Sequence, residues 1–207
     1  VRPWNVDFGE SRCRLFRVFS DGSNEYLLYF EQHYPSGTAG VTAAGPAFKR
    51  FQNLAKTLVT TAQDRPSVET KPYKGEIERF GGSLIYPNLN VGGAEPDAAQ
   101  PSREGALPVL DTALGDTIEF VAFQQGSREI RFDTGPLGKA FKVLNQCTFG
   151  LIEAWGLDPE QQRTAQSLPR WINVRDIVKR IRAAYPNNAV RRGEGGVTRM
   201  RVIVNET

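Results

Sequence analysis

The chain has 207 residues, of which 40% are hydrophobic and 24% charged, and its net charge is +3. These proportions are ordinary for a soluble globular protein with one substantial core. No apolar run reaches the roughly 18 residues of a membrane-spanning helix, so no membrane span is predicted. Seven basic residues fall within the last thirty positions with one aromatic residue, Tyr185, among them, which is not the interleaving of a nucleic-acid platform and argues against nucleic acid as a partner.

Alternating apolar and polar residues predict β-strands in the first part of the chain. The alternation covers 4–8 and 13–17, and a further strand, 26–30, follows the turn-forming residues Ser20-Asp21-Gly22-Ser23. Residues 37–46, rich in Gly, Ala and Thr, predict a thin strand. The next stretch, 47–62, fits either a short helix or a strand.

The middle of the chain predicts a long loop followed by a hairpin. Residues 83–115 are rich in Gly, Pro and Ala, and the segment 92–105 has little apolar content, which is typical of a surface loop. Residues 117–123 and 128–133 are β-prone and flank Gln-Gln-Gly-Ser, so they predict a β-hairpin.

Two amphipathic helices follow. Apolar residues recur at helical spacing from Leu137 to Trp155, with Pro136 suited to the first turn and Gly156 to the exit. A second helix is predicted over 173–184, with Asn173 as its cap. The polar stretch 158–172 between them predicts a linker and a domain boundary.

The two cysteines, Cys13 and Cys147, lie on a predicted strand and on the core-facing side of the first helix. They are either inert thiols of a cytosolic protein or one disulfide formed in an oxidising compartment. Their compatible placement favours the disulfide, worth about 3–5 kcal/mol. The single histidine, His33, has no plausible ligand partners, so neither a metal site nor a cofactor is predicted.

One motif suggests catalysis. Phe132-Asp133-Thr134-Gly135 matches the signature loop of aspartic proteases, and a single loop requires a homodimer to pair two carboxylates. Pro136 and a helix follow at once, however, so we expect Asp133 and Thr134 to satisfy the free N–H groups of that helix. No serine elbow or phosphate-binding loop is present. We therefore predict no enzymatic activity, with an Asp133-dependent hydrolase as the alternative.

The tail resembles the opening of the TonB C-terminal domain. A Tyr-Pro pair, a small residue three positions on, Gly-x-Val and alternating valines carry the resemblance; the matching positions are Tyr185, Pro186, Ala189, Gly196, Val197, Val202 and Val204. The resemblance implies contact with an envelope protein or receptor peptide by strand addition. The residues expected to bind the partner are Val197, Arg199, Arg201, Val202 and Val204. The chain is then a possible fragment of a longer energy transducer to outer-membrane receptors.

The order of features from Trp4 and Cys13 to Cys147 and Trp155 also resembles an N-terminal module that precedes TonB-type domains. A fainter similarity links it to the secreted invasion-associated locus B proteins. We therefore expect an α+β, periplasmic or secreted protein: a β-rich, sandwich-like module over 1–157 covered by one helix, a linker over 158–172, and a partial αβ segment over 173–207. A ligand-binding sandwich with 83–115 as a lid is a further alternative.

Overall fold

The computed structural model describes residues 3–91, 107–164 and 172–192. The chain forms two compact units, 1–164 and 165–207, which are described separately. As expected, the fold is α+β: the first unit contains two antiparallel sheets and a few helices.

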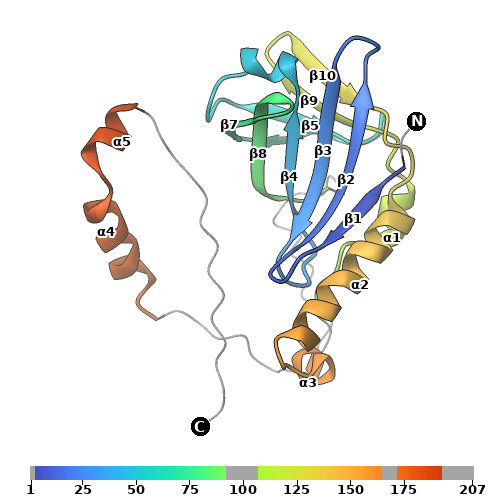
Figure 1. The fold of residues 1–207 in the computed structure, drawn as a ribbon, viewed down its shortest axis with the longest axis vertical. Helices are drawn as coiled ribbons and strands as arrows, with labels where there is room; N and C mark the ends of the chain where they lie inside the picture. Colours follow the sequence, from blue (N-terminus) through green and yellow to red (C-terminus); the bar gives the residue numbers. More distant parts are fainter. Residues whose placement is uncertain (1–2, 92–106, 165–171, 193–207) are drawn as a thin grey trace. The chain divides into compact units, whose positions relative to one another are not determined.

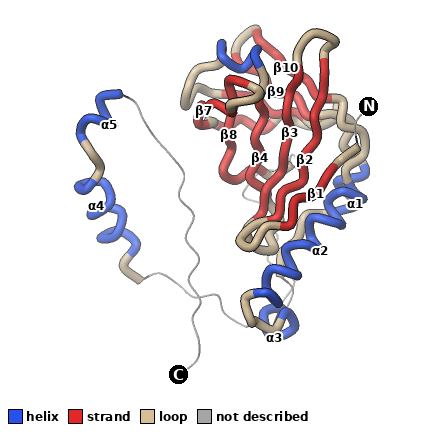
Figure 2. Tube along the Cα trace, in the orientation of Figure 1, coloured by secondary structure: helices blue, strands red, loops and turns tan. Residues whose placement is uncertain are grey.

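The larger sheet has six strands in the order β1-β2-β3-β4-β8-β7 (Figure 2). Every neighbouring pair is antiparallel. The predicted alternation is confirmed in β2, where Cys13, Leu15 and Arg17 are buried and the residues between them are half-buried. The strands are β1 (Asn5–Phe8), β2 (Cys13–Ser20), β3 (Glu25–Gln32), β4 (Ala39–Ala44), β7 (Tyr73–Ile77) and β8 (Gly81–Leu89).

The smaller sheet has four strands in the order β10-β9-β5-β6. They are β5 (Thr57–Thr60), β6 (Val68–Thr70), β9 (Val121–Gln125) and β10 (Arg128–Phe132). The predicted hairpin is confirmed as β9–β10. Its two-residue loop starts with Gly126 at φ 60°, the residue that a type II′ turn requires at this position.

The two sheets share one hydrophobic core. Tyr86 of β8 stacks on Phe123 of β9 with ring centroids 5.4 Å apart. Phe48 lies between the sheets and contacts Phe123 and Phe132. Because each such aromatic side chain contributes about 1.5–3 kcal/mol on burial, this cluster holds the sheets together.

The predicted core helix is confirmed as α2 (Gly138–Ala154), which contacts β1, β2 and α1 (Thr112–Asp116) (Figure 1). Its inward stripe includes Phe141, Leu144 and Leu151. The Asn145 amide also donates to the Leu110 carbonyl and accepts from the Leu110 N–H, which fixes the chain segment beside the helix. A short helix, α3 (Pro159–Thr164), follows.

The expected loop over 83–115 needs one correction. Its first residues belong to β8 (Gly81–Leu89), which lies between β4 and β7 in the larger sheet. The two glycines and the proline of this strand are residues depleted in strands, so the sequence did not indicate it. The ambiguous stretch 47–62 contains both options: a 3₁₀ helix, η1 (Pro46–Arg50), and β5.

The second unit contains α4 (Val174–Ala184) and α5 (Asn187–Arg192). The predicted helix is confirmed as α4, but the Asn173 side chain makes no capping hydrogen bond. Instead, the Asn173 carbonyl accepts from the N–H groups of Asp176 and Ile177. The exposed apolar side chains of α4 include Val174, Val178 and Ile181, between 40 and 56% exposed.

Candidate functional site

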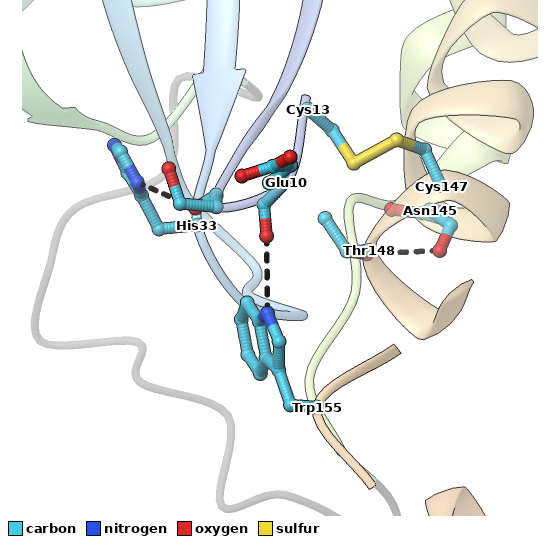
Figure 3. The surroundings of a disulfide bond; sticks show 8 residues. Glu10, Cys13, His33, Asn145, Cys147, Thr148 and Trp155 are labelled. Carbon is cyan, nitrogen blue, oxygen red and sulfur yellow. Dashed lines mark hydrogen bonds between the residues drawn. A yellow bond between two sulfur atoms is a disulfide. The ribbon is translucent and has the colours of Figure 1, made fainter. Parts of the chain in front are cut away.

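The predicted disulfide is confirmed. Cys13 of β2 and Cys147 of α2 are bonded, with their Cα atoms 6.0 Å apart (Figure 3). The indole N–H of Trp155 donates at 3.1 Å to the carbonyl of Glu10, in the turn between β1 and β2. The helix is thus tied to the sheet by one covalent and one polar contact.

Glu31 on β3 lies at the centre of a charged cluster on the larger sheet. It accepts from Arg14 at 2.8 Å and from the His33 ring at 3.1 Å, and the Arg12 guanidinium is 3.6 Å away. Burial alone would raise the pKa of the Glu31 carboxyl, but the hydrogen bonds and charges of Arg14 and His33 hold it below its ordinary value. This geometry stabilises β2 against β3.

Asp133, the residue of the alternative hydrolase hypothesis, directly follows β10. Its side chain is 81% exposed and forms an ion pair with Arg131 at 2.8 Å. In that hypothesis the second carboxylate of a proton-sharing pair comes from another copy of the chain. The expectation that Asp133 and Thr134 cap the following helix is wrong. The helix begins at Gly138, the capping position is Leu137, and no side chain makes a cap hydrogen bond there.

A pocket of about 590 Å³ lies in the first unit between β10 and the end of the β2–β3 hairpin that carries the turn. Aromatic rings form part of its wall. Phe132 lies 5.1 Å from Phe19 and 6.3 Å from Tyr26, both in edge-on contacts. Residues 17–21 of β2 and its turn line one side, and residues 130–133 line the other.

Each side of this pocket is a strand segment that, among the residues that the structure describes, is paired along one edge only. β10 is an edge strand and pairs only with β9. On β2, the pairing with β1 ends at Phe16, so residues 17–20 continue past the end of β1. The pocket is therefore bounded by two open backbone edges.

The pairing register of β9 and β10 determines which backbone N–H and C=O groups of β10 are not bonded to β9. Gln125 faces Arg128 across the two-residue turn, and such a closing pair exchanges both of its hydrogen bonds. Because the pattern alternates, Ile130 and Phe132 also bond to β9, whereas the N–H and C=O groups of Glu129 and Arg131 point to the open side.

The acidic side chains around the pocket already have partners. Asp21 accepts from the N–H groups of Ser23 and Asn24, which, with further hydrogen bonds from Asn24 and Tyr26, lower its pKa to about 2. Glu25 pairs with Arg79 at 2.6 Å. Asp133 pairs with Arg131, so all three of these carboxylates near the pocket already have a hydrogen-bonding or ionic partner.

The remaining predicted site residues lie outside the described part of the chain. This applies to Val197, Arg199, Arg201, Val202 and Val204 of the predicted tail strand, and to residues 92–106 of the lid proposed over 83–115. In the described ranges, no group of three or more His, Cys, Asp or Glu side chains is placed to hold a metal ion. Over the same residues, no helix has the length and apolar content to cross a membrane.

The pocket was not predicted, although one signal pointed towards it. Arg17 occupies the same face of β2 as Cys13 and Leu15, so the alternation places a cation on an inward, apolar face. The order of strands in the sheets, which makes β10 an edge, is not visible in the local sequence.

Comparison with protein-family models, with curated proteins and with solved structures finds no match for this chain.

Proposed function

We propose that this chain is a non-enzymatic protein–protein interaction module that binds an extended peptide segment by strand addition. The observation that carries the proposal is the pocket between two open strand edges, β10 on one side and residues 17–20 of β2 on the other. An added strand would bond to the free N–H and C=O groups of Glu129 and Arg131. Its alternate side chains would enter the aromatic pocket.

The side chains along β10 suit a selective edge. Arg128 and Glu129 are exposed, and Arg131 is paired with Asp133. Charged residues on an edge strand discourage indiscriminate pairing with other chains. A partner must then match both the backbone ladder and the pocket, which supports recognition of a particular segment.

We further propose that the module is of the TonB type, sandwich-like in its first unit, and acts in the periplasm or as a secreted protein. The disulfide supports an oxidising compartment, because such bonds are rare in the reducing cytosol. The Tyr185-Pro186 pattern and the valine-rich tail support the TonB type. In this proposal the tail strand, 197–204, is a second element for pairing with an envelope protein or receptor peptide, as in an energy transducer to outer-membrane receptors.

The test is the variant Glu129→Pro. Proline removes an N–H that points to the open side of β10, so it leaves the β9–β10 ladder intact, and edge strands tolerate it. Glu129→Val is the matched control, since it removes the same charge but keeps the N–H.

The probe is a peptide selected from a random dodecapeptide library on the immobilised, disulfide-bonded chain. We expect the control to bind it as the wild type does, and Glu129→Pro to lose at least tenfold in affinity. Equal binding by all three proteins, or failure to select any peptide, would contradict strand addition at β10.

A further inference from the structure

Arg17 is a buried cation in the wall of the pocket. Only 7% of the residue is exposed, and its guanidinium donates to the Thr134 carbonyl at 3.1 Å. The guanidinium also lies 4.8 Å from the centre of the Phe19 ring and 5.8 Å from that of Trp4. These contacts hold the side chain in place between β2 and the segment that follows β10.

This cation has no counter-ion among the described residues, since no carboxylate oxygen there lies within 4.0 Å of its nitrogens. Burial lowers the pKa of Arg17, but an arginine side chain stays charged in proteins. A buried charge without an opposite charge is costly, so an anion entering the pocket would be strongly favoured.

Unsatisfied hydrogen-bonding atoms gather around the same side chain. The Nε of Arg17 has no partner, nor do the indole Nε1 of Trp4 and the hydroxyl of Thr134, and all three atoms are buried. Arg17 contacts both of the other residues. Such orphan groups are uncommon in folded proteins, and here all of them are able to donate.

The carboxylates around the pocket cannot serve as the counter-ion of Arg17. Asp21 is held by its own turn, Glu25 by Arg79, and Asp133 by Arg131. The partner must therefore bring the negative charge, and the neighbouring Phe19, Tyr26 and Phe132 side chains offer an apolar surface beside it.

We propose that the pocket recognises a carboxylate on the added strand: an aspartate or glutamate flanked by apolar residues, with Arg17 as its counter-ion. This inference rests on the proposed strand addition and assigns the chemistry of its ligand. A guanidinium carries its charge and its N–H donors on a rigid plane that matches a carboxylate, which gives directional as well as electrostatic selectivity.

The experiment compares a selected peptide with its amide isostere, in which Asp is replaced by Asn or Glu by Gln. Selected sequences should contain an acidic residue next to aliphatic or aromatic ones. The acidic peptide should bind the wild-type chain at least tenfold more tightly than the isostere, the range expected for hydrogen bonds between charged groups.

Arg17→Gln should abolish this discrimination, whereas the matched control Arg50→Gln, at an exposed arginine outside the pocket lining, should retain it. Circular dichroism checks that each variant is folded. If Arg17→Gln does not fold, Arg17→Lys replaces it and should reduce the discrimination, because an ammonium keeps the charge but loses the paired donors.

Equal affinity of the wild type for the acidic peptide and its isostere would overturn the carboxylate inference, with no need for a variant. Strand addition would still stand if Glu129→Pro abolished binding of both peptides. Conversely, Glu129→Pro could bind the acidic peptide as tightly as the wild type does and still prefer it to the isostere. That result would support the carboxylate site and refute strand addition. Failure to select any peptide would refute both.

Discussion

Removal of the disulfide tests how much of the stability of the first unit depends on the link between β2 and α2. The double variant Cys13→Ala/Cys147→Ala removes a cross-link between positions 134 residues apart. In the chain-entropy model a closed loop of this size lowers the entropy of the unfolded chain enough to contribute about 5 kcal/mol. Much of the 5–15 kcal/mol that stabilises a typical domain would then depend on this bond.

The assay is urea denaturation followed by tryptophan fluorescence, with the oxidised wild type and the double variant measured at the same pH. We expect the free energy of unfolding to fall by about 3–5 kcal/mol. Site-resolved hydrogen exchange should show the largest loss of protection in α2, since the Trp155–Glu10 hydrogen bond becomes its main polar tie to the N-terminal strands. A loss below about 1 kcal/mol, or a loss confined to regions away from α2, would refute this reasoning.

Three other changes follow from the contacts of single residues. Gly138→Ala should lower the free energy of unfolding by about 1–3 kcal/mol, because a Cβ there would collide with the Thr112 carbonyl and the Asp116 side chain. Gly150→Ala, in the same helix but with open space around it, should raise that free energy by about 0.5–1 kcal/mol, and equal effects in urea denaturation would contradict both assignments. Glu31→Gln should destabilise the chain at neutral pH, where the carboxylate is charged. Because the pKa of Glu31 is lowered in the folded chain, the extra stability of the wild type is fully present above the ordinary glutamate pKa of about 4.3. It disappears as the pH falls through the lowered pKa. A stability difference between wild type and variant that does not change with pH would count against the ion cluster.

Sequence reasoning found the features whose signals are local. The strands around Cys13 and Tyr26, the hairpin at Gly126 and the helix at Leu144 each have a periodicity or a turn residue of their own. The disulfide was predicted because both cysteines were placed on inward faces, one on a strand and one on the helix.

Features that depend on distant parts of the chain were missed. β8 contains glycines and a proline and lies in the interior of the sheet, so it gave no alternating pattern. The expected cap at Asp133 failed because the helix begins only at Gly138, and the Asp133 carboxylate pairs with Arg131 instead. The open edge of β10 depends on the strand order of two sheets, which no short segment encodes.

Hydrogen exchange of the ¹⁵N-labelled chain, free and saturated with a selected peptide, tests strand addition at the pocket between β10 and β2. On binding, the amides of Glu129 and Arg131 should become protected, while those of Ile130 and Phe132, already bonded to β9, should change little. If the chain is saturated with the peptide and the Glu129 and Arg131 amides exchange as fast as before, the peptide does not add to the β10 edge.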